Sequence, residues 1–151
     1  MKVFLDTNVF LEYFEQRREF KAVSQLFNAI EDHLLQAVVS VGTVYTLAYL
    51  VRMELKRQEV FRPQQTLQLR STLNTILSMV TVVGVNHKHL LLGVNDIAFD
   101  DVEDSFQYQC ALQNKCDILV TINLRDYRNA DTSKLEILSP TEFTNKYLYS
   151  I

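Results

Sequence analysis

Short apolar runs alternate with helical segments along the chain, and this alternation is the strongest constraint on its fold. The first run, Val3-Phe4-Leu5, has no polar interruption, as is typical of a central parallel strand buried on both faces. Further strands are predicted over residues 37–41, 82–85, 118–122 and 135–138. The pattern predicts an α/β fold, a three-layer α/β/α sandwich around a parallel sheet of about five strands.

In the segments between the predicted strands, apolar residues recur at the spacing of a helix. Helices are predicted over residues 8–14, 20–30, 86–94 and 102–114. Two more helices, around residues 47–51 and 69–80, are expected to pair as a hairpin. The last helix carries a capping box, with Ser139 at the N-cap, Pro140 at the first helical position and Glu142 three residues after the cap.

Length and composition fit one ordinary domain spanning residues 1–151. The apolar fraction of 48% and the charged fraction of 22% are close to globular averages. The three glycines, Gly42, Gly84 and Gly93, are too scattered to form a glycine-rich loop that brings backbone close to phosphate. Nucleotide binding by such a loop is excluded.

Targeting and redox features indicate a soluble, cytoplasmic protein. The carboxylate of Asp6 comes too early for the apolar core of a signal peptide, and no apolar run approaches the roughly 20 residues of a membrane span. Cys110 and Cys116, six residues apart on a predicted helix, are expected to be buried, reduced thiols rather than a disulfide or a zinc site.

Acidic and amide side chains follow two of the predicted strands. Asp6 ends the first strand, and Asn123 and Asp126 follow the fourth. Asp101 and Asp104 begin the helix that leads into the fourth strand, and their i, i+3 spacing places both on one side. Since ligands bind beyond the carboxyl ends of parallel strands, Asp6, Asp104, Asn123 and Asp126 converge if the first and fourth strands are neighbours.

Several carboxylates in one cleft repel each other unless a cation offsets their charge. Oxygen ligands without histidine or cysteine suit Mg²⁺ or Mn²⁺. One such ion, or a pair about 4 Å apart, activates water and stabilises charge on a phosphate. The implied chemistry is phosphodiester hydrolysis.

Each of these residues also has a purely structural interpretation. Asp6 suits the N-cap of the next helix, and Asp101 and Asp104 suit a cap and a first-turn acid. Asn123 and Asp126 suit a loop with side-chain turns. The functional interpretation gains weight only because these side chains gather at predicted carboxyl ends.

Histidines and one aromatic segment are assigned no functional role. His33, His87 and His89 lack metal-ligand spacing. The aromatic residues of segment 10–14 are expected to lie in the core rather than to form a base-stacking surface: Phe10, Tyr13 and Phe14.

Three motifs together resemble those of PIN-domain nucleases, a family that includes the VapC toxins of bacterial toxin–antitoxin pairs. They are Leu5-Asp6-Thr7-Asn8-Val9, the acidic segment 101–107, and Val120-Thr121-Ile122-Asn123 followed by Arg125-Asp126-Tyr127. Their order and spacing cover essentially the whole chain. Each motif is weak alone, but the combination is fairly specific.

The resemblance implies a ribonuclease that depends on Mg²⁺ or Mn²⁺ and cuts single-stranded RNA. It implies metal ligands at Asp6, Asp104, Asp126 and Asn123, with Thr121 orienting a ligand or the attacking water. It implies supporting roles for Asn8, Asp101 and Glu103. It also implies an antitoxin partner and a homodimer formed through the helices around residues 47–80.

One departure from the family pattern concerns the segment 40–47. Many members place a glutamate where this chain has Thr46, and a neutral hydroxyl is the weaker ligand. Glu54 lies two helical turns further on, too far to substitute. The alternative function is therefore a weakened or inactive relative that serves as an RNA-binding or protein-interaction module.

Other protein classes fit less well. Haloacid-dehalogenase-like phosphatases need an aspartate where this chain has Asn8, and a response-regulator receiver needs a lysine after a late strand, which here ends in Thr121-Ile122-Asn123. A non-enzymatic interaction module with a helical dimer face is distinguished from a metal-binding nuclease by adding Mn²⁺, because the ion would not stabilise such a module against heat.

The net charge of −3, with 15 basic and 18 acidic residues, at first argues against a nucleic-acid partner. Five of the acids are the proposed site residues or their neighbours, which leaves 15 basic against 18 − 5 = 13 acidic residues elsewhere. The charge therefore does not exclude RNA. Candidate phosphate contacts are Arg17, Arg18, Lys21, Arg52, Lys56, Arg57, Arg62, Arg125 and Arg128.

Overall fold

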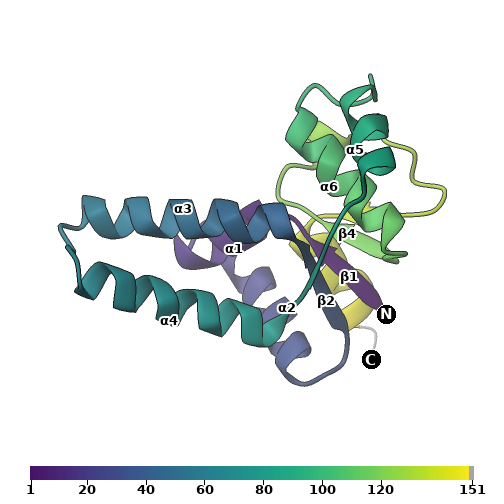
Figure 1. Cartoon of the computed structure of the whole chain (residues 1–151). Helices are drawn as coiled ribbons and strands as arrows, with labels where there is room; N and C mark the ends of the chain where they lie inside the picture. Colours follow the sequence, from purple (N-terminus) through teal and green to yellow (C-terminus); the bar gives the residue numbers. More distant parts are fainter. Residues whose placement is uncertain (150–151) are drawn as a thin grey trace.

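A five-stranded, fully parallel sheet forms the centre of the protein, in the order β3-β2-β1-β4-β5. A computed structural model describes residues 1–149 (Figure 1). The strand bounds are β1 Lys2–Leu5, β2 Gln36–Ser40, β3 Thr81–Val83, β4 Ile118–Val120 and β5 Glu136–Leu138. The predicted three-layer α/β/α fold is confirmed.

Helices cover both faces of the sheet. One face carries α1 (Thr7–Phe14), α2 (Phe20–Glu31), α3 (Val41–Arg57), α4 (Gln64–Met79), α7 (Pro140–Phe143) and the π-helical turn η2 (Thr144–Leu148). The other face carries α6 (Val102–Gln113), against which α5 (His87–Val94) packs, and the 3-10 turn η1 (Leu124–Tyr127). The predicted capping box at Ser139 and Glu142 begins α7.

The central strand β1 explains why its sequence is uninterruptedly apolar. Val3 and Leu5 lie in the core cluster beneath α1 and α2, whereas Phe4 lies in the cluster beneath α6. All three side chains are fully buried. Alternate residues of one strand therefore fill two separate cores.

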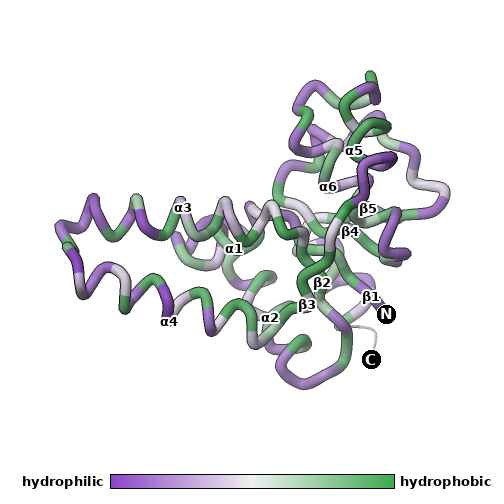
Figure 2. The backbone as a smooth tube through the Cα atoms, viewed as in Figure 1, coloured by the Kyte–Doolittle hydropathy of each residue, from purple (hydrophilic) through white to green (hydrophobic). Residues whose placement is uncertain are grey.

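The predicted helical hairpin is confirmed: α3 and α4 lie side by side and extend well beyond the sheet (Figure 1). Only Thr43 and Leu47 of α3 are buried, both in its first half. Hydrophobic and hydrophilic residues alternate along both helices (Figure 2). The outer half of the hairpin therefore leaves much of its surface to solvent or to a partner.

Three strands end earlier than predicted, and at two of them side-chain hydrogen bonds redirect the backbone. The predicted strand 37–41 stops at Ser40, whose Oγ accepts a hydrogen bond from Thr43 N at 3.0 Å and caps α3. The predicted strand 118–122 stops at Val120, and Ile122 N donates to Asn8 Oδ1 at 3.1 Å instead. The predicted strands 82–85 and 135–138 are observed as 81–83 and 136–138.

The aromatic prediction was partly wrong. Phe10 is buried and Tyr13 packs against Phe27 with ring centroids 4.9 Å apart, but Phe14 at the end of α1 is 43% exposed. The cysteine prediction is confirmed, since Cys110 and Cys116 are buried and free. Within residues 1–149, no helix has the length and apolarity needed to cross a membrane.

Candidate active site at the carboxyl edge of the sheet

Neighbouring strands β1 and β4 bring two polar side chains together, because Leu5 pairs with Val120 and the next residues are Asp6 and Thr121. Thr121 Oγ1 donates to Asp6 Oδ2 at 2.9 Å. Asn8 binds the same turn, with Nδ2 3.4 Å from Thr121 Oγ1 and Oδ1 accepting from Ile122 N. Asn8 thus fixes the end of β4 beside Asp6.

Hydrogen-bond donors surround the carboxylate of Asp6, which is 4% exposed. Its Oδ1 accepts from Thr7 N at 2.8 Å and from Gln107 Nε2 at 3.2 Å. Its Oδ2 accepts from Thr121 Oγ1 and from Tyr127 OH, the latter at 3.0 Å. These four bonds use the roughly four acceptor sites of a carboxylate and hold the side chain rigidly.

Gln107 links Asp6 to the start of α3. Its Nε2 also donates to Thr43 Oγ1 at 2.8 Å, and its Oε1 accepts from Ser40 Oγ at 2.6 Å. Thr7 and Thr43 share a hydroxyl hydrogen bond of 2.8 Å. Sequence reasoning assigned no role to this network, although Gln107 stands three residues after Asp104 and therefore on the same helical face.

Asp104 has a contrasting environment in the first turn of α6. The side chain is half-buried, and among residues 1–149 no donor forms a hydrogen bond with its carboxylate. Burial raises its pKa to about 7, with further contributions from the negative charges of Asp6, Asp101, Asp126 and Glu103. A cation at this carboxylate would relieve both effects.

Asp101 and Glu103 lie at the rim. Asp101 is the N-cap of α6, and its Oδ1 accepts from Glu103 N at 2.9 Å. Both side chains are exposed. The capping interpretation of Asp101 is therefore correct, and its charge additionally acts on Asp104.

The turn after β4 brings Asp126 only into the neighbourhood of the site. Asn123 and Asp126 are exposed, and neither is among the described residues that line the cleft. Asp126 still raises the pKa of Asp104. Tyr127, to which sequence reasoning gave no role, is buried, and burial together with Asp6 raises its pKa well above 10, so it remains a donor to Asp6.

A cleft of about 470 Å³ opens above these residues between α1, α3, α5 and α6. Thr46 is exposed and lines its α3 side, facing the space that Asp6 and Asp104 also line. Apolar side chains complete its wall, among them Leu50, Val85, Leu90 and Phe106. The cleft thus combines the carboxylates of Asp6, Glu103 and Asp104 with apolar walls.

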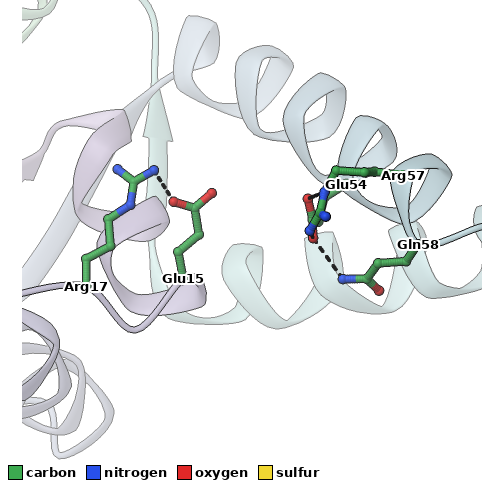
Figure 3. A network of polar contacts seen from close by, with 5 residues as sticks. All are labelled: Glu15, Arg17, Glu54, Arg57 and Gln58. Atoms are coloured by element: carbon green, nitrogen blue, oxygen red, sulfur yellow. Dashed lines mark hydrogen bonds and ion pairs between the residues drawn. The ribbon is translucent and has the colours of Figure 1, made fainter.

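Glu54 does not replace the missing glutamate of α3. It lines a separate hollow and is bound by Arg57 and Gln58 (Figure 3). The hydrogen bond from Arg57 lowers its pKa to about 2, with a smaller contribution from Gln58. Its charge is therefore used within the hairpin.

The donor set fits a hard divalent cation bound through few protein ligands. Within residues 1–149, no three His, Cys, Asp or Glu side chains are close enough together to hold a metal ion by themselves. Mg²⁺ commonly binds through one or two carboxylates, with waters and substrate phosphates completing its shell. Asp104, which accepts no hydrogen bond from residues 1–149, and Asp6, which lines the same cleft, would supply such a pair.

The sequence matches the family model described as PIN domain over residues 2–125, and the chain belongs to this family. Among solved structures, it is similar to a DNA-bound VapBC from Salmonella typhimurium, with TM-score 0.67, 16% identity and coverage of 93% of this chain and 98% of that one. It is also similar to VapBC2 from Rickettsia felis bound to a promoter DNA fragment, with TM-score 0.63, 15% identity and coverage of 91% and 98%. No curated protein sequence is significantly similar.

Proposed function

We propose that the protein is a Mg²⁺- or Mn²⁺-dependent endoribonuclease whose reaction takes place in the cleft between Asp6 and Asp104. The observation that carries the proposal is the environment of Asp104, a half-buried carboxylate that accepts no hydrogen bond from residues 1–149 and feels the negative charges of four other acids. Such an arrangement is costly in the free protein and becomes favourable when a cation binds. Membership of the PIN domain family supports the same chemistry.

The residues of the cleft have distinct roles in this proposal. Asp104 and Asp6 would hold the divalent ion, which when bound would supply an activated water and offset charge on the scissile phosphate. Thr121, Tyr127 and Gln107 orient Asp6 through their hydrogen bonds. Because Gln107 Nε2 has a shorter bond to Thr43 than to Asp6, it is the donor that would most easily give way if an ion bound Asp6.

Residues at the rim have smaller roles. Asp126 and Asn123 lie outside the described lining of the cleft, so their roles as metal ligands stay a prediction, and the charge of Asp126 acts on Asp104. Asn8 secures the end of β4, while Asp101 and Glu103 attract the cation into the cleft. Thr46 offers the ion at most a neutral oxygen, so binding is weaker than with a carboxylate.

We also propose that the protein is the toxin of a toxin–antitoxin pair and binds an antitoxin protein. Both of the similar solved structures named above are VapBC complexes, and the chain spans nearly the whole of each matched chain. The homodimer through the α3–α4 hairpin remains a prediction.

Replacement of Asp6 by asparagine tests the nuclease. We expect Mn²⁺-dependent cleavage of single-stranded RNA to disappear in Asp6→Asn while circular dichroism shows a folded protein. Asp100→Asn, an exposed acid that is not among the cleft-lining residues, is the matched control and should cleave normally. If purified Asp6→Asn cleaves as fast as the unsubstituted protein, the site assignment is wrong.

The second candidate function is an inactive RNA-binding or protein-interaction module. Thr46 in the place of a glutamate and the lack of a three-acid cluster among residues 1–149 favour it. Thermal unfolding with and without millimolar Mn²⁺ separates the two functions, because only the metal site gains stability from the ion.

A further inference from the structure

The outer face of α3 carries aromatic and cationic side chains and no acid. Its members are Val41, Tyr45, Tyr49, Arg52, Met53 and Lys56, which recur at three- and four-residue steps and so share one side of the helix. We call these residues the α3 face. Tyr45 is 75% exposed and Tyr49 54%, so both rings are open to contact from outside the chain.

The α3 face connects the candidate active site to a cationic hollow. Val41 lines the cleft at one end. Arg52 and Lys56, at the other end, line a hollow of about 460 Å³ together with Arg62 and the exposed Phe61. Over the 15 residues from Val41 to Lys56 the helix rises about 22 Å, a length that accommodates several nucleotides.

The chemistry of the α3 face matches single-stranded nucleic acid. Exposed aromatic rings stack with bases of any sequence, and nearby cations bind the phosphates. Arg52 already lies over the Tyr49 ring, 6.0 Å from its centroid, so ring and charge are presented together. The described residues that line the hollow include three cations and no carboxylate, whereas the acids gather in the cleft.

We propose that the α3 face is the track along which a single RNA strand lies as it enters the cleft, with bases stacked on Tyr45 and Tyr49 and phosphates bound by Arg52, Lys56 and Arg62. This proposal rests on the proposed ribonuclease function and adds where the strand binds. It also requires a strand with unpaired bases, since duplex RNA does not offer its base faces to protein rings.

Binding of a fluorescent, mixed-sequence, single-stranded oligoribonucleotide, measured in EDTA so that no cleavage occurs, tests the track. Tyr45→Ala and Tyr49→Ala should each weaken binding about tenfold. The double variant Arg52→Gln with Lys56→Gln should make the slope of log affinity against log salt concentration shallower by about 0.7 for each cation removed. Leu67→Ala on α4, where Leu67 is 60% exposed, is the control. Unchanged affinity in both tyrosine variants overturns the proposal.

A fluorescence reporter keeps the test independent of folding defects. The chain contains no tryptophan, so Tyr49→Trp introduces a single indole on the track and Leu67→Trp introduces one elsewhere. The oligoribonucleotide should quench the first indole and not the second. Absent quenching, or equal quenching in both, contradicts stacking at Tyr49.

Two outcomes separate this proposal from its alternatives. If Tyr45→Ala and Tyr49→Ala convert a dimer to a monomer in sedimentation without changing RNA affinity, the face is an interface between copies and the proposal is wrong. If the track variants bind weakly but the unsubstituted protein never cleaves RNA with Mn²⁺, the nuclease function fails and the track stands. If the track variants bind and cleave RNA as the unsubstituted protein does, the track proposal fails and the nuclease function stands.

Discussion

Asp6 and Asp104 line the same cleft but have opposite surroundings. Asp6 is buried beneath four hydrogen-bond donors. Asp104 is half-buried, has no donor among residues 1–149, and lies near four other acids that raise its pKa. Hydrogen bonds hold the carboxylate at the end of β1 rigid without metal, whereas under the proposed function the carboxylate at the start of α6 would receive the cation.

The largest expected effect concerns Asp104 itself. Asp104→Asn should slow Mn²⁺-dependent RNA cleavage at least about a hundredfold, because a metal contributes several kcal/mol of charge stabilisation to the transition state. Thermal unfolding without metal should show a protein at least as stable as the unsubstituted one, since a repulsive charge is removed. Cleavage within a few-fold of normal would show that Asp104 does not hold the ion.

Alanine at each of the two positions tests whether the two carboxylates contribute differently to stability. Asp6→Ala leaves the buried hydroxyls of Thr121 and Tyr127 without their acceptor and should cost about 1–3 kcal/mol. Asp104→Ala should cost nothing measurable. Urea unfolding of the two metal-free variants checks this expectation, and equal destabilisation would mean that Asp104 is structural rather than poised for a ligand.

Thr46→Glu adds a carboxylate on the opposite wall of the cleft and tests whether this position lies at the ion. We expect Mn²⁺ to bind about tenfold more tightly, because affinity for hard cations rises with the number of charged ligands. Isothermal titration of Mn²⁺ measures the change, with Thr66→Glu on α4, outside the cleft lining, as the control. Unchanged or weaker binding would contradict the placement of Thr46 at the ion.

The smallest expected effect is on the pH dependence of stability. The pKa of Asp104 is about 7 in the fold against 3.8 for an ordinary aspartate, so the folded chain binds the proton more tightly. Without metal, this group should therefore cost stability as pH rises from about 4 to about 7, by about 1 kcal/mol after allowance for solvent screening.

Urea unfolding at pH 5 and pH 8 checks this dependence. The difference in stability between the two pH values should shrink in Asp104→Asn, which cannot ionise. If Asp104→Asn shows the same pH dependence as the unsubstituted chain, the pKa of Asp104 is not raised in the fold.

Sequence patterns predicted the layers of the fold well, because buried positions need apolar residues and their spacing is visible in the sequence. The apolar run at residues 3–5 and the capping box at Ser139 each specify a local structure. Strand ends were harder to predict, since they depend on contacts between distant segments. The hydrogen bond from Ile122 N to Asn8 ends β4, but the apolar pattern of residues 118–122 does not reveal it.

The candidate site was predicted in part for the same reason. Strand order places Asp6 beside Thr121, and the position of α6 places Asp104 near them. The donors Gln107 and Tyr127 depend on side-chain geometry across the sheet, which spacing along one helix does not specify. Phe14 was assigned to the core by its aromatic character, but it is the last residue of a short helix and its neighbours leave it exposed.

Diffraction from crystals soaked in Mn²⁺ tests whether Asp104 and Asp6 hold the ion, because anomalous scattering locates it. We expect one peak in the cleft within coordinating distance of an Asp104 oxygen, with Asp6 as the second carboxylate and Gln107 shifted toward Thr43. An ion bound elsewhere, or a cleft without a peak at a concentration of Mn²⁺ that supports RNA cleavage, would contradict it.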